Sequence, residues 1–515
     1  MEAFLHPLQG LAEFGEIKKR CGANCGILNV SGCMESQKVH LMYGLSGLFP
    51  CHLILADDER NAKEIYEDYR FYDKNVYFYP AKDLLFFQAD IHGNLLIRQR
   101  MRVIRALLEQ EEVTVVTSID GCMDFLMPLE KIRSRLLHFK SDSVIDLDQL
   151  KEELVELGYE RTGQVELPGQ FSVRGGIIDI YPLTEDNPWR IELWDDEVDS
   201  IRSFDAESQR SLENVDEITI YPAAEKMDGE DMVSFLDYFP EEKTLVFLDE
   251  LNHLAENGEG VEEEYRQSRM HREEKGEANL PEQWLCGFQE VQKKLNRRNC
   301  VAVSALSPRR SGWKINEEFD LTVKSVDSYN SSFELLVKDL LQYKSQGYRI
   351  ALLSGSRTRA ERLAKDLSEE GLNAFYRQDT DRIISPGEIM VVYGHARRGF
   401  QYPLIKFAVM TETDIFGKEQ KKRKKKKKYS GNRIQDFAEL SIGDLVVHEK
   451  HGLGIYRGIE KVEVDRVVKD YIKIEYRGGS NLYILATQLD ALQKYSGSSE
   501  NAKTPKLNKL GGQEW

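Results

Sequence analysis

Residues 51–72, CHLILADDERNAKEIYEDYRFY, decide the fold class of this chain. An apolar run of strand length, residues 51–56, leads directly into a segment with the apolar spacing of a helix. Asp57 or Asp58 can cap that helix, because a short carboxylate accepts hydrogen bonds from its first free backbone N–H groups. A strand followed at once by a helix is the unit from which parallel α/β sheets are built.

The same strand-then-helix unit recurs along the chain. It is found in KTLVFLDELNHLAE (243–256) and in YRIALLSGSRTRAERLAKDLSEEGL (348–372). In the latter, Ser356 is a candidate N-cap and Gly371 a candidate helix stop. EEVTVVTSIDGCMDFLM (111–127) adds a further strand that ends near Ser118. The repetition predicts parallel α/β sheets in more than one domain.

Directly upstream, VHLMYGLSGLFP (39–50) resembles a strand entering a phosphate-binding loop. Gly44 and Gly47 give the outline of the loop, but no Gly-Lys-Ser/Thr follows, and phosphate binding needs those side chains. A strand that starts at Cys51 also leaves no room for the helix behind such a loop. We therefore expect no ATP binding here.

LVFLDEL (245–251) resembles the strand that presents a magnesium-binding Asp and a water-activating Glu in P-loop ATPases. Without a phosphate loop, a helix-capping Asp249 is the favoured interpretation. We predict that Gly44, Gly47, Asp249 and Glu250 mark a degenerate, non-functional nucleotide site. We expect no catalytic residues, metal site or cofactor in this chain.

Composition is that of an ordinary globular protein. The chain has 515 residues, 41% hydrophobic and 30% charged, which suggests three or four domains. No apolar run approaches the roughly 18 residues that span a bilayer, and the N-terminus lacks the pattern of a secretory signal. Seven scattered cysteines indicate reduced thiols in a cytoplasmic protein. Cys21, Cys25 and Cys33 form the one tight cluster but lack a fourth ligand nearby, so we interpret them as buried thiols.

The net charge of −17 argues against a general nucleic-acid coat. One segment differs, because residues 421–428 are eight consecutive lysines and arginines. Such a block repels itself and cannot be buried, so it predicts an exposed linker. Contact with DNA and a purely solvated tether both remain open for this run.

Two segments are rich in short strands. Residues 165–222 read as a small antiparallel or mixed β insert with Pro and Gly between its strands. Residues 435–495 read as a small, strongly bent barrel. The tail from residue 496 lacks a core-forming pattern and is interpreted as a linker.

These β-rich segments carry a family resemblance. FSVRGGIIDIYPL, RIELWDDEVDSIRSFD and ITIYPA resemble the module shared by the excision-repair helicase UvrB and the transcription-repair coupling factors (Mfd). LVVHEKHGLGIYRGIEKVEVD with DYIKIEYRGGSNLYI resembles the RNA-polymerase-interacting domain of coupling factors and CarD-like regulators. Their order is similar to the N-terminal portion of the coupling-factor family, over nearly the whole chain.

The resemblance implies an α/β multidomain fold. Its parts are a degenerate P-loop-like parallel sheet, an inserted small β-rich (α+β) domain, a further small α/β domain and a C-terminal bent barrel of Tudor/CarD type. The expected boundaries are 1–126 and 216–330 for the two parts of the UvrB-like α/β domain, 127–215 for the insert, 331–416 for the further α/β domain, 417–434 for the basic linker, 435–495 for the polymerase-interacting domain and 496–515 for a linker toward missing translocase domains.

The resemblance also implies two sets of contact residues. Those expected to bind UvrA are Arg161, Arg174, Arg190 and Glu192. An arginine that UvrB carries two residues before Arg174 is Ser172 here, which puts that contact in doubt. The alternative is that Arg190 and Glu192 simply pair across the sheet surface.

CarD-like domains bind the polymerase β subunit by strand addition, which requires an open sheet edge. The candidates are the strand around Ile459–Val464 and its expected neighbour, Leu482–Leu485. The residues assigned to the polymerase contact are Ile459, Lys461, Val462, Glu463, Tyr483 and Ile484.

The main hypothesis is therefore an adaptor with no enzymatic activity in this chain. It would act as a cytoplasmic monomer that binds the RNA polymerase β subunit and UvrA, without a membrane. The family's ATP- and magnesium-dependent translocase, which displaces stalled polymerase and makes most of the DNA contact, would lie downstream. The alternatives are a UvrB-type ATP-dependent DNA helicase that acts directly on damaged DNA and a CarD-like regulator with an unrelated scaffold.

Overall fold

The computed structural model divides the chain into two compact units. Unit 1 comprises residues 1–265 and 280–418, and unit 2 comprises 266–279 and 419–515. The structure describes residues 1–21, 25–81, 93–224, 232–275, 285–308, 312–417, 431–433, 443–448, 452–464, 467–477, 481–485 and 492–495. No helix in these ranges is long and apolar enough to cross a membrane. The seven cysteines are free thiols, and all but Cys51 are buried.

The first sheet of unit 1 has seven parallel strands. In spatial order they are β17 (Ile315–Asp320), β1 (Ile27–Ser31), β16 (Cys300–Val303), β15 (Thr244–Asp249), β2 (Cys51–Ala56), β4 (Val113–Ser118) and β3 (Val76–Tyr79). The helices associated with it are α1 (Glu2–Leu8), α2 (Ala12–Cys21), α3 (Glu35–Ser46), α4 (Glu59–Tyr72), α5 (Gly93–Glu109), α6 (Ile119–Cys122), α9 (Leu251–Lys275) and α10 (Phe288–Leu295). Most central strands are buried along their whole length, as expected for a parallel sheet covered on both faces.

The predicted caps at Asp58 and Ser356 and the predicted helix stop at Gly371 are confirmed. The Asp58 carboxylate accepts from the Asn61 N–H at 2.6 Å and caps α4. Ser356 caps the helix that starts at the next residue by accepting from the Arg359 N–H at 3.2 Å. Gly371 has φ +78°, the left-handed conformation that ends a helix and favours glycine.

The strand predicted at residues 39–43 is wrong, because these residues lie in the middle of helix α3. The helix is buried on most of its surface, so its apolar residues form a continuous run without helical spacing. Gly44 serves helix packing rather than a loop, since a Cβ there would lie 2.4 Å from Leu8 Cδ1. Gly47 is the residue that follows the helix. The sequence leaves no room for a helix after a loop at Gly44–Gly47. The structure places a helix, α3, over the residues predicted to form the strand before that loop.

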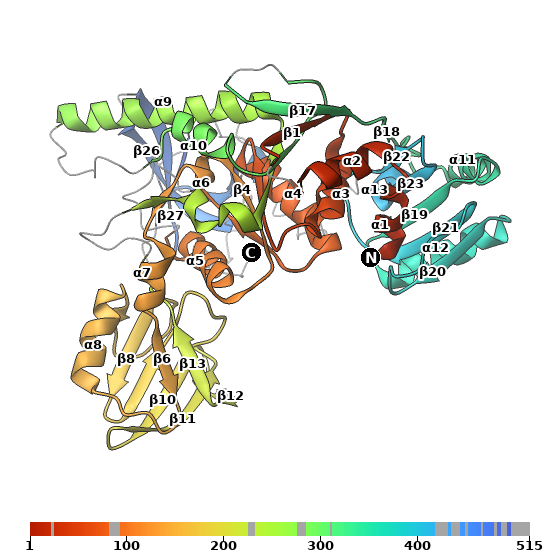
Figure 1. The fold of residues 1–515 in the computed structure, drawn as a ribbon. Helices are drawn as coiled ribbons and strands as arrows, with labels where there is room; N and C mark the ends of the chain where they lie inside the picture. The colour runs from red at the N-terminus through yellow and green to blue at the C-terminus, as the bar shows by residue number, and fades with distance from the viewer. Residues whose placement is uncertain are drawn as a thin grey trace, which may run out of the picture. The chain divides into compact units, whose positions relative to one another are not determined.

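The first sheet and its helices are called the first domain below. An insert lies between two parts of this domain (Figure 1). Its main sheet has the order β12 (Ser211–Val215), β11 (Glu197–Phe204), β10 (Trp189–Trp194), β9 (Ile177–Ile180), β8 (Gln170–Arg174) and β7 (Glu160–Arg161). The pair β6 (Leu137–Lys140) and β13 (Glu217–Ile220), with helices α7 (Leu129–Ser134) and α8 (Leu147–Glu156), completes it. A short antiparallel pair joins the two ends of the insert, with β5 (Phe125–Leu126) against β14 (Val233–Ser234). Two 3-10 helices follow, at Phe235–Tyr238 and Glu241–Lys243.

The remainder of unit 1 is a second α/β sheet. Its strand order is β18 (Lys324–Ser325), β22 (Phe400–Tyr402), β23 (Phe407–Thr411), β19 (Arg349–Ser354), β21 (Glu388–Tyr393) and β20 (Asn373–Arg377). Its helices are α11 (Phe333–Ser345), α12 (Arg357–Glu369) and α13 (Glu412–Phe416). This part of the chain, residues 324–416, is called the third domain below.

Unit 2 contains a six-stranded antiparallel sheet. The order is β24 (Gly431–Arg433), β29 (Leu492–Tyr495), β25 (Leu445–His448), β26 (Gly452–Val464), β27 (Val467–Glu475) and β28 (Asn481–Leu485). Among the strands that the structure describes, β24 and β28 are the two ends of the order, and no pairing closes them into a barrel. The sheet itself agrees with the predicted β-rich domain.

Candidate functional sites

The carboxyl edge of the first sheet holds a lysine bound to two acidic residues. Lys38, in the first turns of α3, places its Nζ 2.6 Å from Asp249 Oδ1 and 2.6 Å from Glu250 Oε1. Asn61 of α4 donates from Nδ2 to Asp249 Oδ2 at 2.6 Å. Although burial lowers the pKa of Lys38, the two carboxylates outweigh it and hold the pKa above its ordinary value. Burial raises the pKa of Asp249, and the Lys38 charge opposes that change.

The loop between β1 and α3 has the topology of a phosphate-binding loop but not its free donors. The Gly32 N–H donates to Ala305 O at 3.3 Å, and the Cys33 N–H donates to Ser304 O at 3.1 Å. Phosphate loops instead aim such amides at the ligand. Gly32 has φ +78°, and a Cβ there would lie 2.1 Å from Leu321 O, so the loop is packed against its neighbour.

These residues do not fit a magnesium nucleotide. The carboxylates that would hold the metal are bound by Lys38, and both loop amides are engaged by backbone carbonyls. Asp249 and Glu250 lie at this edge as predicted, whereas the placement of Gly44 and Gly47 in the same site is wrong. Within the described residues, no three His, Cys, Asp or Glu side chains are grouped to hold a metal ion.

The outer face of the inserted sheet brings together three of the four residues assigned to UvrA. Arg174 Nη2 lies 2.7 Å from Asp179 Oδ2, and Arg190 contacts the same carboxylate with Nε at 2.6 Å and Nη2 at 2.9 Å. The Arg190 guanidinium also lies over the Phe204 ring, 4.3 Å from its centroid. The Arg174 side chain is 45% exposed and the Arg190 side chain is 14% exposed, so the guanidinium group of Arg174 is the more accessible of the two.

Glu192 extends this face and pairs with a residue that sequence reasoning did not name. Arg202, on the neighbouring strand β11, donates from Nη1 to Glu192 Oε2 at 2.8 Å. The hydrogen bonding from Arg202 lowers the pKa of Glu192. The considered pairing of Arg190 with Glu192 is wrong, because both lie on β10 and each pairs with another residue.

Arg161 does not join this network in the structure. It lies on the edge strand β7 in register with Phe171, whose side chain is buried in the insert core. Ser172 is 1% exposed, and its hydroxyl donates to Gly163 O at 3.0 Å. Its short, covered side chain is consistent with the doubt about a contact at that position.

Trp194 is a candidate that sequence reasoning missed. Its side chain is 80% exposed, and it lies two residues after Glu192 on β10, which places it on the outer face. An aromatic residue that ends an alternating strand, before the acidic turn WDDE, was the available signal. We call Arg174, Arg190, Glu192, Arg202 and Trp194 the insert face.

The two strands predicted to contact polymerase are not neighbours. β27 lies between β26 and β28, and Ile459 and Ile484 are both in register with Ile472. β28 ends the strand order, and β25 pairs with β26 only from Gly452 to Ile455. Within the described strands, residues 459–464 and β28 therefore each have one side without a β partner. The side chains of Ile459, Lys461, Val462, Glu463, Tyr483 and Ile484 lie outside the described part of the structure, as does the whole basic run 421–428.

Two family models match the chain. Residues 137–225 match the UvrB interaction domain, and residues 440–496 match the CarD-like/TRCF RID domain. The first covers the insert from β6 to just beyond β13, and the second covers most of the sheet of unit 2.

Curated relatives match most of the length of this chain. The transcription-repair-coupling factor of Bacillus subtilis (strain 168) is 30% identical over 94% of this chain and 47% of its own length. That of Staphylococcus aureus (strain MRSA252) is 28% identical over 86% of this chain and 42% of its own length. The chain thus spans about half the length of the curated relatives that it matches. Together, the two domain models and these relatives support a resemblance of this chain to the N-terminal portion of the longer transcription-repair-coupling factors.

Proposed function

We propose that this chain is the adaptor part of a transcription-repair coupling factor, which binds RNA polymerase and recruits UvrA for nucleotide excision repair. The observation that carries the proposal is the pair of domain matches, one on the insert and one on the C-terminal sheet. The matches do not favour the UvrB-type helicase alternative.

The insert face has the chemistry of a reversible protein interface. Arginine forks beside a shared carboxylate offer bidentate hydrogen bonds, and an exposed tryptophan is a frequent hot-spot residue. Arg174 shares Asp179 with Arg190, so its exposed guanidinium is oriented before any partner arrives. We propose that this face binds UvrA, with Arg174 and Trp194 as the principal contacts and Arg190 as their support.

For the polymerase, the proposal is strand addition to the β subunit by the sheet of unit 2. Strand addition needs backbone groups without a β partner, which the edge strand β28 and the outer side of residues 459–464 present among the described strands. We propose that this sheet is bent into the Tudor/CarD-type barrel of the family.

The chain itself is proposed to hydrolyse no ATP. The support is the Lys38 contact with Asp249 and Glu250, which occupies the position where a metal would bind. In the longer protein, an ATP- and magnesium-dependent DNA translocase would supply the motor that displaces stalled polymerase. The adaptor would act in the cytoplasm as a monomer, with residues 421–428 as a further DNA contact.

A pull-down with two partners tests the proposal. Arg174→Glu reverses the charge of the exposed fork beside Asp179 and is expected to weaken UvrA capture at least tenfold, while capture of the polymerase β subunit stays unchanged. Arg362→Glu on α12 is the matched control, because Arg362 is 84% exposed and lies outside the insert. Unchanged UvrA capture by Arg174→Glu would refute the assignment of the insert face, and loss of both partners would indicate misfolding.

A further inference from the structure

The segment from Gly394 to Tyr402 lies against the first domain. It runs from the end of β21 through β22 in the third domain and contacts helices α3 and α4. Gly394 packs so closely that a Cβ there would lie 2.2 Å from Cε2 of Phe71 on α4. We call this segment the strap.

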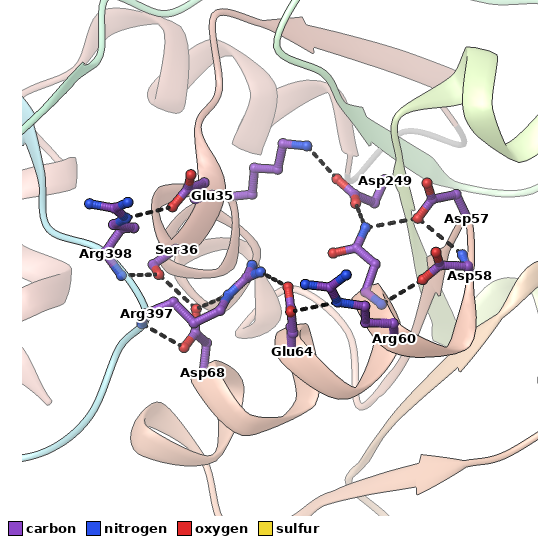
Figure 2. A network of polar contacts seen from close by, with 12 residues as sticks. Glu35, Ser36, Asp57, Asp58, Arg60, Glu64, Asp68, Asp249, Arg397 and Arg398 are labelled. Carbon is purple, nitrogen blue, oxygen red and sulfur yellow. Dashed lines mark hydrogen bonds and ion pairs between the residues drawn. The ribbon is translucent and has the colours of Figure 1, made fainter. Parts of the chain in front are cut away.

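A buried carboxylate anchors the strap. Asp68 of α4 is 1% exposed, and it accepts from the Ser36 hydroxyl at 2.7 Å, from the Arg397 backbone N–H at 3.0 Å and from Arg397 Nε at 3.4 Å (Figure 2). The Ser36 oxygen in turn accepts from the Arg398 backbone N–H at 3.1 Å. Burial raises the pKa of Asp68, while these partners favour its charged form. The buried Asp68 carboxylate therefore takes its hydrogen bonds from residues of both domains.

Two arginine side chains extend the contact over the N-terminal halves of α3 and α4. Arg397 Nη1 pairs with Glu64, and Arg398 Nε lies 3.8 Å from Glu35 Oε2 (Figure 2). In many ATPases, an arginine from a neighbouring domain or partner reaches the nucleotide at the corresponding loop. Here the arginines reach fixed carboxylates instead.

A chain of neutral hydrogen bonds runs beside the ionic contact. The Gln37 amide donates to the Tyr402 oxygen at 3.0 Å, and Tyr402 lies 3.1 Å from His40 Nδ1. His40 Nε2 lies 3.0 Å from Phe4 O, so Nε2 carries the proton and Nδ1 accepts from the Tyr402 hydroxyl. Burial lowers the pKa of His40 to about 4, which keeps it neutral and this donor order intact.

The apolar core crosses the same boundary. One buried cluster contains Val39 and Leu41 of α3 together with Leu353, Val392 and Phe407 of the third domain. Residues this closely packed are expected to lose their structure together.

We propose that the strap locks the first and third domains into a permanently closed pair that needs no nucleotide. The contacts replace, with side chains of this chain, the bridging that a bound nucleotide supplies in ATP-driven domain pairs. The pair then behaves as one rigid scaffold, whose two sheets open in a single cooperative event.

Native-state hydrogen exchange on the whole chain tests this, with mass-resolved peptides covering β2 (51–56) and β19 (349–354). In the unaltered chain, both peptides are expected to exchange through the same opening event across a urea series. Arg397→Met removes the side-chain contacts to Asp68 and Glu64, and it should raise the opening of β19 relative to β2 roughly 10- to 100-fold. Tyr402→Phe, which removes the hydroxyl link, is a milder second variant, and Arg362→Met is the exposed control.

The proposal is overturned if β19 opens at least tenfold more often than β2 in the unaltered chain. It is also overturned if Arg397→Met leaves the ratio of the two peptides unchanged. Addition of magnesium ATP should leave exchange over residues 31–38 unaltered, and protection there would show that a nucleotide, rather than the strap, closes the pair.

Discussion

Removal of the Lys38 ammonium should destabilise the first domain strongly. Lys38→Met keeps the length of the side chain but leaves two carboxylates without their cation. The side chains of Lys38, Asp249 and Glu250 are 11%, 2% and 21% exposed, so this is largely a buried ion pair. Breaking such a pair costs about 3–5 kcal/mol. Because Asp249 keeps its Asn61 hydrogen bond and Glu250 reaches solvent, we expect about 3 kcal/mol.

Urea unfolding followed by circular dichroism measures the effect. Burial and the neighbouring Glu250 charge raise the pKa of Asp249, and without Lys38 the main opposing charge is gone, so the carboxyl binds a proton more readily in the folded than in the unfolded chain. A group whose folded pKa is raised contributes stability at low pH and loses it as the pH rises. The deficit of Lys38→Met should therefore be larger at pH 8 than at pH 5.

Two further variants test the reasoning. Lys38→Met combined with Asp249→Asn removes both charges and should recover a large part of the lost stability. Lys63→Met on α4 breaks an exposed pair with Glu59 and should cost less than about 0.5 kcal/mol. A loss below about 1 kcal/mol for Lys38→Met, or no recovery in the double variant, would refute a buried, internally neutralised site.

Three other predictions follow from single residues. His40 has a folded pKa of about 4 against 6.5 for the free side chain, so the unfolded chain takes up its proton at a higher pH than the folded chain does. The free energy of unfolding should therefore fall as the pH drops below about 6.5 and level off below about 4. Urea titration should show a loss of about 2 kcal/mol at pH 5, and this loss should vanish in His40→Gln. Trp194→Ala should reduce UvrA capture more than tenfold with an unchanged melting temperature, because its 80% exposed side chain supports no core; unchanged capture contradicts its role. Tyr72→Phe should leave stability unchanged or raise it by about 1 kcal/mol in thermal unfolding, since the buried hydroxyl has no hydrogen-bond partner among the residues that the structure describes; a loss above about 1 kcal/mol would reveal one.

Local signals in the sequence predicted the units that repeat a simple pattern. The strand and cap at Asp58 and the helix between Ser356 and Gly371 follow from side chains that act on their own backbone. The same reasoning failed at residues 39–43, because a helix buried on most sides loses the polar spacing that identifies it. It also missed the strand β1. The phosphate-loop position was therefore assigned to Gly44–Gly47, after α3, instead of to the loop between β1 and α3.

The contacts of the candidate sites depend on residues far apart in the sequence, which single-sequence patterns do not pair. Lys38 meets Asp249 across 211 positions, and Arg397 meets Asp68 across 329. Nothing near Lys38 in the sequence marks it as a counter-ion. Arg174 and Arg190 were named correctly as one group, but their shared carboxylate Asp179 emerged only when three strands were aligned.

The short pair of β5 and β14 has a consequence for how this protein can be rebuilt. Leu126 and Val233 are antiparallel partners, so the chain leaves and re-enters the first domain at two points whose Cα atoms lie about 5 Å apart. A tight turn of a few residues spans that gap. The chain path would therefore allow the insert to be exchanged for the corresponding insert of a relative. Leu183 and Tyr221 of the insert also pack in the buried core of the first domain, so a replacement must keep apolar side chains at those two positions.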